Sequence, residues 1–124
     1  MMVHGIARYR QARAGVSPEQ LLVLLLRESV IRLTRVEQLP PDDPGWITDL
    51  HHVRSIVSEL ASALDADAAP ELVSRLSALY SWALAELVRA SRDRDPQLLR
   101  PVRRTLTRLL EGWEEALSEP PSAA

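Results

Sequence analysis

Two histidines and a late group of glutamates are the side chains in this sequence best suited to chemistry. His51 and His52 are adjacent, so on a helix they point about 100° apart and do not easily share a metal ion. No glutamate is followed by a histidine three residues later, which removes the Glu-x-x-His pattern of di-iron bundle enzymes. We therefore predict no metal site.

Other reaction chemistries also lack a motif. Glu111, Glu114 and Glu115 form an acidic run that is typical of a solvated helix face. The four glycines are isolated, so no glycine-rich loop is available to cradle a phosphate, and cysteine is absent. No pattern indicates a Ser-His-Asp site. We expect no catalytic residue and no cofactor, and therefore not an enzyme.

Composition limits the partners. The chain has 124 residues, enough for one domain, and a net charge of −2, which disfavours nucleic acid and anionic membranes. Arg100, Arg104 and Arg108 share one helix face, and we expect that face to be solvated; salt-dependent DNA binding would reverse this interpretation. The longest apolar run, residues 21–26, is far shorter than the ~20 residues of a membrane span. No export signal is visible, so we expect a soluble cytoplasmic protein without membrane insertion.

Four prolines spaced 26 residues apart predict four helices. They are Pro18, Pro44, Pro70 and Pro96. Proline suits the first helical position, and a Ser or Asp that can cap the helix precedes three of the four. We expect helices over residues 18–39, 44–65, 70–92 and 96–118. These predict an all-α, antiparallel up-down four-helix bundle over residues 17–118, with a short mobile N-terminal segment (1–16) and a disordered tail (119–124). Pro101 conflicts with the last helix, so a kink or restart is expected near Arg100.

The helices carry more apolar residues than four core stripes need. The third helix has an expected core face at Leu72, Leu76, Leu79, Ala83, Leu87 and Ala90, and the fourth has one at Leu98, Val102, Leu106, Leu109, Trp113 and Leu117. Beside these lies a second stripe at Val73, Tyr80, Leu84 and Val88, with Ile31, Ile56 and Leu110 as further surplus positions. The surplus fits wide core faces, an outer groove for a partner helix, or a homodimer face.

Several short motifs occur in an order that resembles a known family. They are Tyr9, Ser17-Pro18-Glu19-Gln20-Leu21, Ile56-Val57-Ser58-Glu59-Leu60 with Leu64-Asp65, Leu76-Ser77-Ala78-Leu79-Tyr80, and Leu109-Leu110-Glu111-Gly112-Trp113. Together they resemble the flagellin-specific secretion chaperones of the bacterial flagellum, the FliS family, from Tyr9 to Leu117. The chain departs from the family at Leu26-Arg27-Glu28-Ser29, where Tyr-Asp-Gly-Ala is usual, and loss of the aromatic at position 26 is expected to alter the partner-binding surface.

The resemblance implies a cytoplasmic chaperone that binds the C-terminal segment of flagellin, prevents premature polymerisation and delivers it to the export gate. It leaves the flagellar export apparatus open as a further partner. As contact residues we predict Val73, Tyr80, Leu84 and Val88, with Ile31, Ile56 and Leu110 as weaker candidates, and Ile6 and Tyr9 in a segment that moves when client binds. The alternative is a self-associating helical adaptor that does not bind flagellin and whose free chain is a homodimer.

Overall fold

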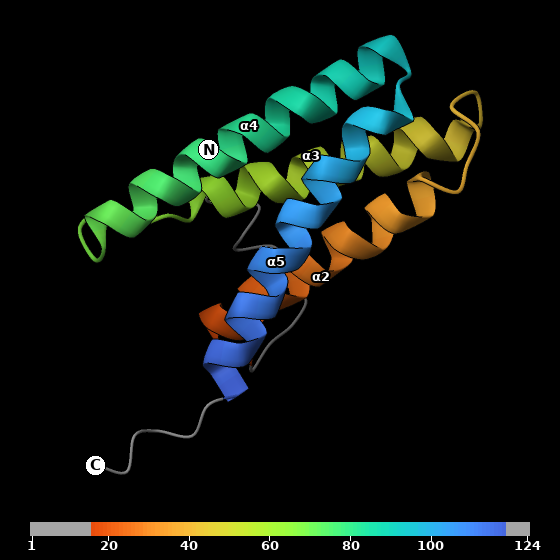
Figure 1. The fold of residues 1–124 in the computed structure, drawn as a ribbon. Coiled ribbons are helices and arrows are strands. Elements are labelled where there is room, and N and C mark those ends of the chain that lie inside the picture. Colours follow the sequence, from red (N-terminus) through yellow and green to blue (C-terminus); the bar gives the residue numbers. More distant parts are fainter. Residues whose placement is uncertain (1–15, 119–124) are drawn as a thin grey trace.

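The computed structural model describes residues 16–118, which form four α-helices and no strand. The helices are α2 (Pro18–Val36), α3 (Pro44–Ser62), α4 (Pro70–Asp93) and α5 (Leu99–Ser118), with a short 3-10 helix, η1 (Pro96–Leu98), before α5. Consecutive helices run in opposite directions (Figure 1), so the predicted all-α up-down bundle is confirmed. The expected tail and residues 1–15 of the expected N-terminal segment lie outside the described residues.

The helix starts follow the predicted proline signals. Ser17 accepts a hydrogen bond from the Gln20 amide at 3.1 Å, and the Gln20 side chain accepts from the Ser17 amide at 3.1 Å, which completes a capping box. Asp43 caps α3 by accepting from the Gly45 amide at 2.8 Å. Ala69 has no capping side chain, so α4 begins with its proline alone.

Two helix ends come three residues earlier than expected. In α2, regular geometry stops at Val36, and the amides of Gln38 and Leu39 donate to carbonyls three residues back. The residue before a proline avoids α geometry, so the chain leaves the helix before Pro40. In α3, the last turn tightens in the same way.

Pro101 determines where α5 begins. The chain forms η1 first, and α5 starts at Leu99, which confirms the restart expected near Arg100. Pro101 is then the third residue of α5, inside the first turn, where a backbone amide has no partner within the helix. The missing N–H of Pro101 therefore costs no helical hydrogen bond.

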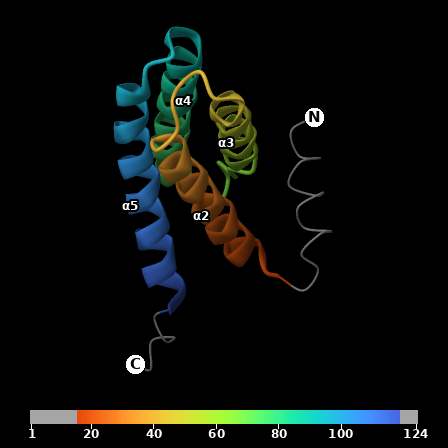
Figure 2. The same ribbon diagram turned by 90° about the vertical axis from the view of Figure 1, so that its right-hand side faces the viewer.

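α2 lies at the centre of the helix packing. It packs along both α3 and α5, whereas α4 packs along α3 and lies beside α5 over a shorter stretch. From the η1 link, α4 and α5 diverge (Figure 1), and α2 with α5 extends away from the other pair (Figure 2). Arg27 and Glu114 form an ion pair at 2.5 Å between α2 and α5, and Glu37 after α2 pairs with Arg103 of α5.

The core corrects the expected stripes on α4 and α5. On α4 the buried set is Leu76, Tyr80, Ala83, Leu87 and Ala90, and on α5 it is Leu99, Val102, Leu106 and Leu110. Leu72 and Leu117 are 49% and 43% exposed, so they do not belong to the expected core faces. The buried side of α5 faces α2, because α5 packs mainly on that helix. The side with Leu109 and Trp113 is therefore only partly buried.

A buried carboxylate joins α2 to α3. Asp49 is 3% exposed and accepts from Arg35 Nε at 2.8 Å and Nη2 at 2.5 Å, and from Arg32 Nη1 at 2.9 Å. The hydrogen bonds from Arg35 hold the pKa of Asp49 below its usual value, against the desolvation that raises it. The ionised carboxylate therefore stabilises the folded state.

We predict that Asp49→Asn lowers the free energy of unfolding by about 1–3 kcal/mol at pH 7, because charged hydrogen bonds are lost in a buried position. A lowered pKa gives stability that is present above about pH 4 and is lost as pH falls through the folded pKa. The difference between variant and wild type should therefore shrink at pH 3. Urea unfolding at both pH values measures it, with the exposed Asp42→Asn as control. An equal difference at pH 3 would contradict the assignment.

Candidate partner-binding groove

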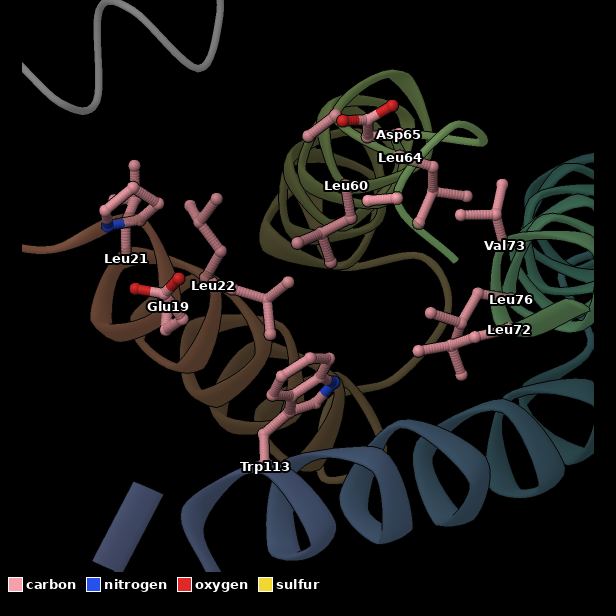
Figure 3. Close-up of a pocket in the computed structure, with 14 residues that line it drawn as sticks. Glu19, Leu21, Leu22, Leu60, Leu64, Asp65, Leu72, Val73, Leu76 and Trp113 are labelled. Carbon is pink, nitrogen blue, oxygen red and sulfur yellow. The ribbon is translucent and has the colours of Figure 1, made fainter. Parts of the chain in front are cut away.

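An apolar cleft of about 380 Å³ opens at one end of the bundle. The start of α2, the end of α3 with its following link, the start of α4 and the later part of α5 line it (Figure 3). Twelve of its fourteen lining residues are apolar, and the two acidic ones are Glu19 and Asp65. The apolar set is Pro18, Leu21, Leu22, Leu25, Leu60, Ala63, Leu64, Ala68, Leu72, Val73, Leu76 and Trp113.

A second hollow of about 270 Å³ extends this cleft between α4 and α5. The two share Leu72, Leu76 and Trp113, so they form one continuous surface, here named the open-end groove. Trp113 projects into it from α5, and Leu72 and Leu76 face it from α4 (Figure 3). The second hollow adds Arg108, Leu109, Gly112 and Ala116 from α5. The groove exists because α4 and α5 diverge here and leave these side chains without a facing helix.

A different hollow, here named the α3–α4 groove, runs along the outer face of α3 and α4. Five of its seven lining residues are polar, among them His51, Arg54 and Glu59. Its apolar residues are Leu84 and Val88. It is therefore less suited than the open-end groove to an apolar partner.

The structure divides the predicted α4 stripe among three environments. Val73 lines the open-end groove, Tyr80 is fully buried, and Leu84 and Val88 line the α3–α4 groove. The Tyr80 hydroxyl has no hydrogen-bond partner among residues 16–118, and burial raises the pKa of Tyr80 to about 12. The four residues do not form one continuous wall. The start of α4 lines the cleft, whereas the middle of α4 packs into the core.

The remaining predicted contact residues are also dispersed. Ile6 and Tyr9 lie outside the described residues. Ile31 is 58% exposed on α2, Ile56 is fully buried, and Leu110 lies at the edge of the core. That these residues contact a partner stays a prediction.

Sequence reasoning missed most of the groove, because Leu72, Leu76, Leu109 and Trp113 have the type and spacing of core residues. The one separate signal was Gly112, a glycine inside a helix and beside a tryptophan. An added Cβ at Gly112 would meet nothing within 4 Å, so packing within the described chain does not require glycine there.

Residues 26–29, at which the sequence departs from the family pattern, make contacts within the bundle. Leu26 is fully buried, so its side chain does not form the partner-binding surface expected for position 26. Arg27 pairs with Glu114 of α5, and Ser29 donates to the backbone carbonyl one turn earlier at 3.1 Å. Glu28 lies 3.2 Å from His52 Nε2 and 3.3 Å from Arg32 Nη2.

Neither a metal cluster nor a membrane span is found in the part of the chain that the structure describes. Residues 16–118 hold no group of three or more His, Asp or Glu side chains placed to bind a metal ion. None of their helices is long and apolar enough to cross a membrane.

Comparison with known proteins gives the family. Residues 2–120 match the family described as flagellar protein FliS. The chain belongs to the FliS family. A relative from Pseudomonas aeruginosa, flagellar secretion chaperone FliSB, is 30% identical over 107 residues, covering 82% of each chain. The FliS match includes all four described helices, and therefore every residue that lines the open-end groove.

We predict that two leucines of α4 differ in their contribution to stability. Leu87→Ala empties a fully buried position and should lower the free energy of unfolding by about 2–5 kcal/mol. Leu72→Ala removes a half-exposed side chain in the groove and should cost less than about 1 kcal/mol. Urea unfolding of the two variants tests the assignment. Equal losses would show that Leu72 belongs to the core.

Proposed function

We propose that this chain is a cytoplasmic flagellar export chaperone that binds the C-terminal segment of flagellin in the open-end groove. The observation that carries the proposal is the groove itself, an apolar hollow lined by leucines and a tryptophan, in which Leu72 is 49% exposed. Membership of the FliS family and the secretion-chaperone name of the P. aeruginosa relative support it.

The groove suits an amphipathic helix. An apolar helix face docks in an apolar groove through residues one turn apart. The α5 wall runs from Arg108 to Ala116, nine residues that span about 12 Å, which matches roughly two turns of a partner helix. A client held in this way keeps its own apolar face from assembling with other copies until it is delivered.

The chaperone acts without covalent chemistry. Burial of apolar surface on binding supplies the binding energy, at roughly 25 cal/mol per Å² of apolar surface. We therefore propose a binding protein rather than an enzyme, with delivery of the client to the export apparatus as the step that follows binding.

We predict that the wild-type chain and flagellin from the same organism form a one-to-one complex, which is lost when the C-terminal segment of flagellin is deleted. Size-exclusion chromatography with light scattering measures it. Leu72→Glu should weaken the complex at least tenfold, because a charge replaces an apolar contact in the groove. Val88→Glu is the matched control, since Val88 is a similarly exposed α4 residue in the α3–α4 groove.

Two results would overturn this proposal. Loss of the complex by Val88→Glu and not by Leu72→Glu would move the client to the α3–α4 groove. A constant oligomer that ignores flagellin would favour the alternative, a self-associating adaptor whose own copies cover the open-end groove.

A further inference from the structure

The wall that α5 gives to the open-end groove continues into a row of arginines. Residues 100, 104, 108, 112 and 116 follow one another at four-residue spacing, so each lies next to the following one, while the row turns by about 40° around α5 at every step. The last two, Gly112 and Ala116, line the groove, and so does Arg108. Arg104 and Arg100 carry the same row beyond it toward the start of α5. The α5 lining of the groove thus changes from the small residues Gly112 and Ala116 to the basic Arg108, and Arg104 lies one turn before Arg108.

These arginines have no partner within residues 16–118. Arg100, Arg104 and Arg108 are exposed, and none forms an ion pair or side-chain hydrogen bond there. Arg103, which lies off the row, is paired with Glu37. Glu111 and Glu115, later in α5, are exposed and form no ion pair with the row, and Glu114 is paired with Arg27 of α2.

The charges of α5 also oppose its own dipole. Arginines occupy the first half, where the helix end carries partial positive charge, and glutamates occupy the second half. The first turn has no acidic residue and the last turn has no basic one. The helix dipole therefore does not explain Arg100 in the first turn, and it acts little on Arg104 and Arg108, which lie beyond that turn.

Gly112 gives a second, independent observation. Glycine is among the poorest residues for a helix interior, and open space surrounds the position of its missing Cβ. The folded chain would gain helix stability from almost any other residue here. A glycine facing a groove instead allows the backbone of a docked helix to come close.

We propose that the open-end groove accepts a helix whose small residues pack on Gly112 and whose acidic residues contact Arg108 and Arg104. The acidic contacts fix the direction and register of the client, since its apolar face alone could slide along the leucines. This inference rests on the proposed function, because it names the chemistry of the client in the same groove. A nucleic acid is disfavoured as the occupant, because the row leads into an apolar groove and the whole chain has a net charge of −2.

Calorimetry with the C-terminal segment of flagellin tests the charge contact. Arg108→Glu should weaken binding about tenfold or more and reduce its dependence on salt, since an attraction becomes a repulsion. Arg54→Glu is the matched control, because it makes the same change of charge in the α3–α4 groove and should leave the affinity within twofold. A segment whose acidic residues are changed to amides should bind wild type more weakly, and Arg108→Glu should then add little further loss.

Gly112→Gln tests the close approach with two readouts that should move in opposite directions. The midpoint of thermal unfolding should rise by roughly 2–6 °C, because glutamine is a better helix former. The affinity for the flagellin segment should fall at least tenfold, because the new side chain occupies the groove. A variant that is more stable and binds as well as wild type would overturn the role of Gly112.

The failure of this inference is distinct from that of the proposed function. If the wild-type chain binds no flagellin segment, both fall. If wild type binds it and Arg108→Glu binds equally well with the same salt dependence, the charge contact is wrong while the chaperone function stands. Salt-dependent binding of a DNA duplex that Arg108→Glu removes, with flagellin affinity unchanged, would assign the row to nucleic acid instead.

Discussion

The structure depends on α5 packing along α2 rather than along the whole of α4. Ion pairs from Arg27 to Glu114 and from Glu37 to Arg103 fasten the two ends of this interface, and Leu99, Val102 and Leu106 fill it with buried apolar surface. Because one face of α5 is committed to α2, the start of α4 and the end of α5 separate. The apolar residues between them become a groove instead of a core.

α2 therefore holds both neighbours with polar contacts in addition to packing. Asp49 joins it to α3 through Arg32 and Arg35, just as Arg27 joins it to α5. Removing Arg32 or Arg35 would leave the buried Asp49 carboxylate with too little compensating charge, so the contact between α2 and α3 resists rearrangement. The exposed pair between Arg27 and Glu114 contributes less, about 0–1 kcal/mol. Together with apolar packing, these contacts hold α2, α3 and α5 in a fixed arrangement. That arrangement allows leucines such as Leu72 to stay partly exposed at the open end.

The sequence predicts the helix starts well, because proline after a capping residue is a local signal that packing does not change. It predicts the ends less well, since the tightening of the last turns of α2 and α3 depends on the links that follow. It predicts the groove least. Leu72 and Leu87 have the same type and lie on the same helix, and only the angle between α4 and α5 makes one a groove residue and the other a core residue. The arginine row and Gly112 are visible in the sequence, but their meaning depends on knowing that α5 borders a groove.

α4 is attached differently from the other helices. Within residues 16–118, its side chains form ion pairs only inside the helix, between Glu86 and Arg89 and between Arg92 and Asp93. Its link to the rest of the polar network is Arg94, which follows the helix and donates to the carbonyl of Pro41 at 2.6 Å. Apolar contacts are non-directional, so α4 can shift its start relative to α5 without breaking a directed bond. Within residues 16–118, the start of α4 is therefore held by apolar packing alone, whereas ion pairs join α2 to α3 and to α5.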